Sequence, residues 1–295
     1  MSAASELGIV TGKKTVAQRV LGVISSSVVN IVLLIVAIFW LVPTVGLLIM
    51  SLRTVGDNSS SGWWTVLTKP AELTIQNYVN LLSNSTITGS FWNTIMIAVP
   101  STALVVIIGA LAAYAFAWTE FWGRDWLLIV VIILLAVPVQ VALIPLATMF
   151  GALGIFGSVF GVVLFHTAFG LPFAIFLLRN FFLQVPAELL EAARIDGSSE
   201  WRIFFQMMLP LALPAIASLA IFQFLWTWND MLVALIFTNP DSMPLTVAIQ
   251  SQLRQFGSNI DVLSAGAFLS MIVPLIVFFA FQRYFVQALL AGSQK

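Results

Sequence analysis

Long apolar stretches separated by shorter polar segments dominate this chain. Each stretch is continuously apolar over about 20 residues, the length that a helix needs to cross a bilayer. None alternates apolar and polar residues as the strands of a membrane barrel do. The sequence therefore predicts an all-α, polytopic membrane protein with six transmembrane helices. The predicted spans are 28–50, 91–117, 126–149, 158–178, 211–237 and 264–282.

The composition agrees with this pattern. Of the 295 residues, 60% are hydrophobic and 8% are charged, and the mean hydropathy is +1.05. A soluble protein carries roughly 25% charged residues, and no segment of soluble composition is long enough to form a separate domain. The 12 basic residues balance the 12 acidic ones, so net charge does not favour a nucleic-acid partner. With no cysteine and one histidine, the sequence predicts no metal site and no catalytic residue.

The basic residues indicate the orientation, because cytoplasmic loops carry an excess of Lys and Arg. With the N-terminus inside, nine of the twelve basic residues are cytoplasmic: Lys13, Lys14, Arg19, Arg124, Arg179, Arg194, Arg202, Arg283 and Lys295. Only Arg53, Lys69 and Arg254 are outside. Both termini are thus predicted to be cytoplasmic. The predicted organisation is a tail (1–27), the first span with an outer loop (28–90), a core of five spans with a cytoplasmic loop at 179–210 (91–283), and a second tail (284–295).

The long cytoplasmic loop predicts two short helices. Pro186 suits the first turn of a helix, where its missing N–H costs nothing, and Glu188 favours the positive end of the helix dipole. Gly197 fits the C′ position, so we expect a helix over 186–196. Ser198 or Ser199 is expected to cap a second helix that stops before Pro210.

The first of these helices has features of a docking surface. Ala192 and Ala193 are small and allow another surface to approach closely. The helix also carries charges of both signs, unlike a basic lipid-binding helix. The charged residues are Glu188, Glu191, Arg194 and Asp196.

This loop resembles the Glu-Ala-Ala loop of ABC importer permeases. The resemblance lies in Glu191-Ala192-Ala193, in Gly197 and in Leu209-Pro210, with Met207 where the family often has Ile. Trp226-Thr227-Trp228-Asn229-Asp230 resembles the carbohydrate branch, and the layout is most similar to the maltose-type second permease subunit. The resemblance implies a type I ABC importer permease fold in a prokaryotic cell membrane. It also implies that Glu188, Glu191, Ala192, Ala193, Arg194, Asp196, Gly197, Leu209 and Pro210 couple the chain to an ATPase.

The resemblance further implies a set of partners. These are a second, homologous permease subunit, two copies of a cytoplasmic ATPase, an extracytoplasmic solute-binding protein and a sugar, all in or at the lipid bilayer. ATP and Mg are expected on the ATPase and no cofactor on this chain. The nearest approach to an ATP-binding loop, Gly8 to Thr15, is one residue too short. The outer loop 238–263 is expected to reach toward the solute-binding protein or simply to be solvated.

Polar residues within spans mark a watery path or a packed interior. Trp226, Trp228, Asn229 and Asp230 suit a sugar path, since aromatic faces and hydrogen-bonding side chains hold carbohydrates. The alternative is that both tryptophans pack between helices and that Asp230 pairs with a partner subunit. Gln140 and Gln223 are expected to bond between helices or to line the path. His166 is expected to have a packing role rather than a proton-relay role, because its span holds no second ionisable residue.

Other functions remain open at this stage. A secondary transporter would require several buried ionisable residues or paired broken helices, and Asp230 alone qualifies. A permease for a non-sugar solute, such as a glycerol-phosphate ester or an osmolyte, would share the coupling loop. A membrane scaffold without transport activity would not require that loop.

Overall fold

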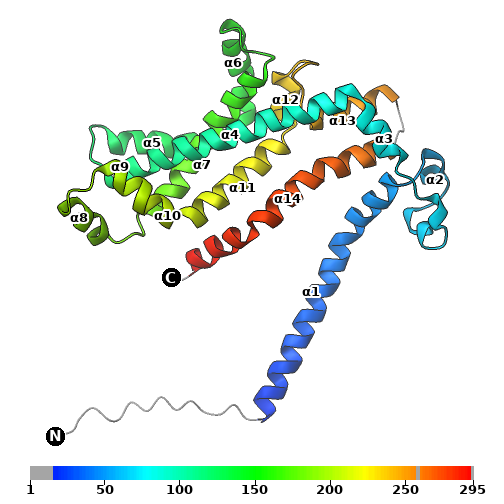
Figure 1. The fold of residues 1–295 in the computed structure, drawn as a ribbon, viewed down its shortest axis with the longest axis horizontal. Helices are drawn as coiled ribbons and strands as arrows, with labels where there is room; N and C mark the ends of the chain where they lie inside the picture. Colours follow the sequence, from blue (N-terminus) through cyan, green and yellow to red (C-terminus); the bar gives the residue numbers. More distant parts are fainter. Residues whose placement is uncertain (1–15, 257–259, 294–295) are drawn as a thin grey trace.

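The computed structural model describes residues 16–256 and 260–293, and all the regular elements in these ranges are helices (Figure 1). The longer helices are α1 (Val16–Ser51), α4 (Ser85–Trp118), α5 (Arg124–Leu135), α6 (Val139–Ala152), α7 (Val159–Phe182), α11 (Leu213–Trp228), α13 (Leu245–Phe256) and α14 (Ile260–Ser293). The shorter ones are α2 (Val55–Ser60), η1 (Trp63–Leu67), η2 (Pro70–Glu72), α3 (Gln76–Ser83), α8 (Ala187–Ile195), α9 (Glu200–Ile203), η3 (Phe204–Met208), α10 (Leu209–Leu211) and α12 (Leu232–Phe237). The all-α prediction is confirmed.

Four of the predicted spans are single helices. They correspond to Ser27–Ser51, Ser85–Trp118, Val159–Phe182 and Leu263–Arg283. The other two predicted spans are bent pairs, with 105° between α5 and α6 and 75° between the segment 200–211 and α11. Counting each pair as one span gives the six that the sequence predicts. The prediction of six spans is therefore confirmed when each bent pair is counted as one, and the third and fifth spans are bent rather than straight.

Proline explains both bends. Pro138 is the N-cap residue of α6, and the residue before a proline is driven out of the helical region. Pro214 lies in the first turn of α11, where its missing N–H is tolerated, and the break falls just before it at Ala212. The predicted fifth span also ran on to residue 237. In the structure α11 ends at Trp228 and a separate helix, α12, follows.

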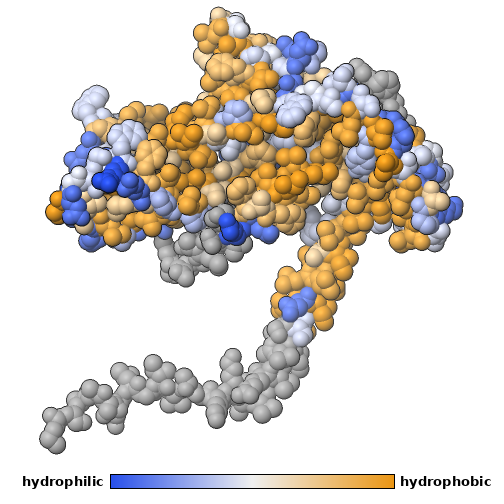
Figure 2. Space-filling model, in the orientation of Figure 1, coloured by the Kyte–Doolittle hydropathy of each residue, from blue (hydrophilic) through white to orange (hydrophobic). Residues whose placement is uncertain are grey.

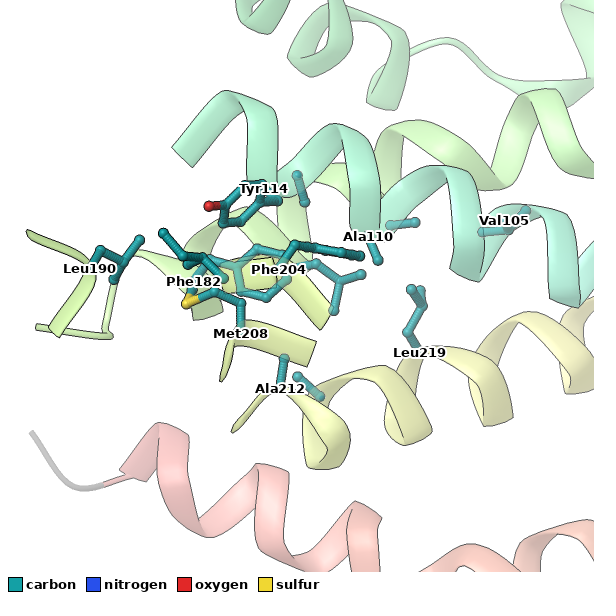
Figure 3. Packing of buried hydrophobic residues seen from close by; sticks show 14 residues of the cluster. Val105, Ala110, Tyr114, Phe182, Leu190, Phe204, Met208, Ala212 and Leu219 are labelled. Carbon is teal, nitrogen blue, oxygen red and sulfur yellow. The ribbon is translucent and has the colours of Figure 1, made fainter. Parts of the chain in front are cut away.

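The core forms where α4, α7 and α11 lie side by side (Figure 1). A side chain at Gly109 would place its Cβ 2.7 Å from that of Ala174, so a glycine is needed where α4 meets α7. At one end of these helices the buried side chains come from the long cytoplasmic loop as well. Figure 3 shows Leu190 of α8 beside Phe182 of α7 and Met208 of η3, and all three are fully buried. The loop 179–210 is thus packed onto the spans.

The first outer loop is also folded. Arg53 is fully buried and its Nη2 lies 2.7 Å from Glu72 Oε2. The same guanidinium donates to the carbonyl oxygens of Asp57 and Gly62, both at 3.1 Å. This basic residue therefore organises α2, η1 and η2 into a compact unit. The core helix α4 begins at Ser85, six residues before the predicted boundary at 91.

Apolar side chains cover most of the surface between two polar ends (Figure 2). The apolar residues of α1 from Val28 to Val45 are largely exposed, and this helix extends away from the others toward its N-terminus (Figure 1). In a soluble protein such a surface would be an aggregation hazard. A bilayer is the solvent that this surface requires, so the chain is a multi-pass membrane protein.

Candidate coupling and translocation sites

The predicted docking helix is α8, a short amphipathic helix on the surface. Pro186 occupies its N-cap position, one residue earlier than expected. Leu190 is fully buried against the spans and anchors the helix. The opposite face is exposed and carries Glu191 and also Ile195, whose side chain is 85% exposed. Ile195 lies between Arg194 and Asp196 in the sequence and was not among the predicted coupling residues.

The end of α8 has the geometry that the sequence predicts. Gly197 has φ +81°, in the left-handed region. Its N–H donates to the Arg194 carbonyl and that of Ser198 to the Ala193 carbonyl, both at 3.0 Å. These two bonds define a Schellman motif, which satisfies carbonyl groups at the helix end and turns the chain sharply. A Cβ at Gly197 would meet no atom within 4 Å, so steric space within this chain does not require the glycine.

The second loop helix differs from the prediction. Ser199 accepts a hydrogen bond from the Arg202 N–H at 3.4 Å and caps α9. A π-helical segment, η3, then leads into α10, whose first turn contains Pro210. The helical segments thus continue to Leu211 and do not stop before Pro210. The reason is that proline is accepted in a first helical turn, and the π-helical segment before it allows a new turn to begin.

An ionic network holds the two loop helices against α4. Arg194 Nε donates to Glu200 Oε1 at 2.8 Å, and its Nη2 donates to the Trp118 carbonyl at 3.0 Å. The hydroxyl of Tyr114 donates to Glu200 Oε2 at 2.5 Å. The hydrogen bond with Glu200 raises the pKa of the Arg194 guanidinium. Arg194 is therefore paired with Glu200, a residue that sequence reasoning missed.

The remaining predicted coupling residues fall into two groups. Glu188, Ala192, Asp196 and Pro210 are exposed, whereas Ala193 and Leu209 are half-buried and pack against the core. Apart from Pro210, which lies in α10, the exposed group gives α8 and its C-cap a free surface of small and acidic side chains. This arrangement is compatible with docking, and the coupling role of these residues stays a prediction.

A pocket of about 300 Å³ lies between α7 and α11. Its lining consists of Phe169, Gly170, Phe173, Phe222, Gln223 and Trp226. Gln223 is buried and donates to Thr227 Oγ1 at 3.2 Å, and a Cβ at Gly170 would lie 2.5 Å from its Oε1. An aromatic lining with one polar group is typical of a site for a small ligand. We refer to these six residues as the aromatic pocket.

The structure separates the four residues predicted for the path. Trp226 lines the aromatic pocket, whereas Trp228 is buried, stacks on Phe224 and donates from Nε1 to the Ser270 carbonyl at 3.0 Å. Trp228 therefore packs between helices, which was the alternative to a place in the sugar path. Asn229 is exposed and donates to the Leu225 carbonyl at 2.8 Å.

Asp230 occupies the break after α11. Its carboxylate accepts the backbone N–H groups of Val233 at 3.3 Å and Ala234 at 3.0 Å, which fixes the start of α12. Its Oδ2 also lies 3.6 Å from Nε2 of His166. The second ionisable residue that the span of His166 lacks is thus supplied by a neighbouring segment. Gln140 is exposed at the start of α6 and is not buried between helices, as the expected bonding between helices would require.

The last outer loop is partly helical. Asn93 on α4 donates to the carbonyls of Asp241 at 2.9 Å and Met243 at 3.1 Å. The helix α13 follows from Leu245, within the predicted loop 238–263. Residues 257–259 of the predicted loop lie outside the described residues. The loop segment 238–244 is thus held in place by α4.

The helices, the loop 179–210 and the apolar surface together define a permease component of a transport system. The family model of the binding-protein-dependent transport system inner membrane component matches residues 105–290, and the chain belongs to this family.

Among its relatives is the osmoprotective compounds uptake permease protein GgtD of Synechocystis sp. (strain PCC 6803), with 48% identity over 90% of this chain and 91% of the relative. The alpha-glucoside transport system permease protein AglG of Rhizobium meliloti (strain 1021) is 50% identical over 77% of this chain and 62% of the relative.

Solved structures show the same fold. A chain of a bacterial ABC transporter involved in the import of the acidic polysaccharide alginate superimposes with a TM-score of 0.76. The alignment covers 93% of this chain and 100% of that chain, at 23% identity. At this identity the likeness establishes the fold alone, which is that of a type I ABC importer permease.

Proposed function

We propose that this chain forms half of the translocation path for a carbohydrate in an ATP-driven importer. The observation that carries the proposal is the aromatic pocket, in which Trp226 and three phenylalanines surround Gln223. Sugars present C–H faces to aromatic rings and hydroxyls to amide groups, so this lining suits a di- or oligosaccharide. The name of the relative AglG supports an α-glucoside as the substrate.

The driving force comes from a separate ATPase that docks on α8. The exposed Glu191 and Ile195 supply a polar and an apolar contact, and the Schellman end at Gly197 gives the helix a rigid, protruding shape. ATP and Mg bind to that ATPase, which is present in two copies. A second permease forms the other half of the path, and an extracytoplasmic binding protein delivers the solute. Both termini of this chain are cytoplasmic.

A second candidate substrate is an osmoprotective compound. It is favoured by the name of the relative GgtD, which is 48% identical over 91% of its own length. A carbohydrate osmoprotectant would satisfy both names, whereas a charged osmolyte would not need the same hydroxyl-binding group.

The test is uptake by the assembled transporter. The tagged chain, purified from its own host with its partners and reconstituted in vesicles, would be supplied with binding protein and with labelled maltose, trehalose or glycine betaine. We expect uptake of an α-glucoside that needs ATP and persists when ion gradients are collapsed. Uptake of glycine betaine alone would contradict the carbohydrate assignment, and uptake driven by an ion gradient would contradict the importer class.

Two substitutions connect the uptake to the pocket. Trp226→Ala removes one aromatic face and should raise the KM for sugar by about two- to tenfold, since an aromatic contact is worth roughly 0.5–1.5 kcal/mol. Trp122→Ala is the matched control, because this tryptophan is 98% exposed and lies outside the pocket. Equal KM values for the two variants would exclude the aromatic pocket from the path.

A further inference from the structure

His166 is a buried ionisable residue that the proposed path does not yet use. It lies in α7 with 0% of its surface exposed, and neither ring nitrogen has a hydrogen-bond partner within the described part of the chain. Leaving a buried polar group unpaired is destabilising. An ionisable residue inside a membrane span is costly in any case and is typically retained for a function.

The nearest acidic group is only slightly too far away to bond. His166 Nε2 lies 3.6 Å from Asp230 Oδ2, and the exposed fractions of the two side chains are 1% and 11%. An N–H···O bond extends to about 3.2 Å, so a movement of a few tenths of an ångström would close it. A small displacement from the position in this structure would therefore bring the two groups into a direct hydrogen bond.

The histidine side of this contact touches the aromatic pocket. The His166 ring stands edge-on to the Trp226 indole, with ring centroids 5.0 Å apart and an interplanar angle of 84°. Trp226 lines the pocket and is 38% exposed. A ligand that rests on the indole would therefore press on the imidazole behind it.

The aspartate side of the contact is connected to the outer face. The Asp230 carboxylate holds the first turn of α12, and its carbonyl accepts the Thr246 hydroxyl at 2.7 Å at the start of α13. The segment 238–244 joins these two helices. A change at the Asp230 carboxylate is thus transmitted to the outer loop through two short links.

We propose that His166 is a positioning residue that transmits occupancy of the aromatic pocket to the outer loop. A sugar on Trp226 moves the imidazole, whose Nε2–H then donates to Asp230, and the segment 238–244 changes position with α12 and α13. By thermodynamic linkage, a ligand that holds the outer loop in its second position favours sugar in the pocket. This inference rests on the proposed sugar path.

The experiment uses the natural absence of cysteine from the sequence. Asp241→Cys introduces one thiol on the exposed outer segment, and its reaction rate with a membrane-impermeant maleimide is measured in the assembled transporter. The rate is compared with and without maltose, or with trehalose if that is the sugar transported. His166→Leu removes the donor at similar volume, His166→Gln keeps a donor, and Thr167→Val is the matched control at the next buried position on α7.

In the otherwise unchanged protein and in Thr167→Val, we expect sugar to change the labelling rate by roughly fivefold or more. His166→Leu should abolish this response and raise the KM for uptake, with membrane level and ATPase association unchanged. His166→Gln should restore part of the response, which a purely space-filling role would not do. A full response in His166→Leu would overturn the role of His166 while leaving the sugar path intact. Failure of the unchanged protein to take up any α-glucoside would overturn both proposals.

Discussion

Gly197 combines a backbone requirement with an open environment. Its φ of +81° disfavours any other residue by roughly 1–2 kcal/mol, yet a side chain there would meet nothing within this chain. We expect Gly197→Asp to leave membrane insertion near normal, to weaken ATPase association and to abolish uptake, because a side chain would project toward the docked ATPase. Glu191→Lys, on the exposed face, should have the same pattern. Membrane level, ATPase association and uptake are measured together.

A matched control exists in the other cytoplasmic turn. Gly123 has φ +80° and also has no atom within 4 Å of its Cβ position, so Gly123→Asp imposes similar backbone strain away from α8. We expect this variant to transport normally. Normal transport by Gly197→Asp and Glu191→Lys, with a fully associated ATPase, would show that α8 is not the coupling helix.

Glu200 is the centre of the network that ties α8 and α9 to α4. Glu200→Gln removes the ion pair with Arg194, and because the two side chains are 38% and 45% exposed, the loss should be about 1 kcal/mol. We expect the purified complex to melt a few degrees lower and to hydrolyse ATP with less uptake per ATP. Asp125→Asn, which breaks the exposed Arg124–Asp125 pair, is the control. Indistinguishable behaviour of the two variants would contradict this role.

The sequence predicts some of these residues and not others for a physical reason. Pro186 and Gly197 act on the backbone within a few residues, so their positions alone predict a helix and its end. Glu200 acts through Tyr114, which is 86 residues away, and no local pattern records that distance. The same limit applies to His166, whose acidic neighbour comes from another helix.

Some helix breaks can likewise be predicted from the sequence and others cannot. The break between α5 and α6 coincides with Pro138, and a proline in the span could indicate it. No proline marks the break after Trp228. There the carboxylate of Asp230 caps the start of α12. Continuous hydropathy therefore predicts the number of spans when bent pairs are counted as one, but it does not predict their internal breaks.

The outer segment 238–244 is an element whose position depends on α4. Asn93→Ala removes both hydrogen bonds to this segment, at the carbonyls of Asp241 and Met243. If the segment contacts the solute-binding protein, the variant should respond less to it, with ATPase stimulation falling several-fold and assembly unchanged. The measurement is ATP hydrolysis with and without binding protein.

Thr88→Ala is the control for this element, because the Thr88 hydroxyl bonds only to carbonyls of its own helical turn among the contacts described, at Asn84 and Ser85. Its stimulation should equal that of the unchanged protein. Undiminished stimulation of Asn93→Ala would instead favour a merely solvated outer segment.

The molecule as a whole has two polar ends and an apolar middle (Figure 2). The predicted coupling helix α8 lies at one end, whereas α2 and α3 lie at the other (Figure 1). These ends have to face opposite sides of the bilayer, because both are polar and the surface between them is apolar. The folded outer loop also buries Arg53, so one of the three basic residues assigned outside has a structural role.

Topology can be tested with the same cysteine-free background. Ser60→Cys places a thiol on the exposed first outer loop, and Glu120→Cys places one on the exposed turn between α4 and α5. Nine of the twelve basic residues lie inside when the N-terminus is cytoplasmic, so a membrane-impermeant maleimide added to intact cells should label Ser60→Cys and not Glu120→Cys. Permeabilised cells should label both, which controls for reactivity.

A reporter fused after Lys295 should be active only in the cytoplasm. Labelling of Glu120→Cys in intact cells, or an extracytoplasmic signal after Lys295, would reverse the orientation, and α8 would then lie on the wrong side of the membrane for a cytoplasmic ATPase.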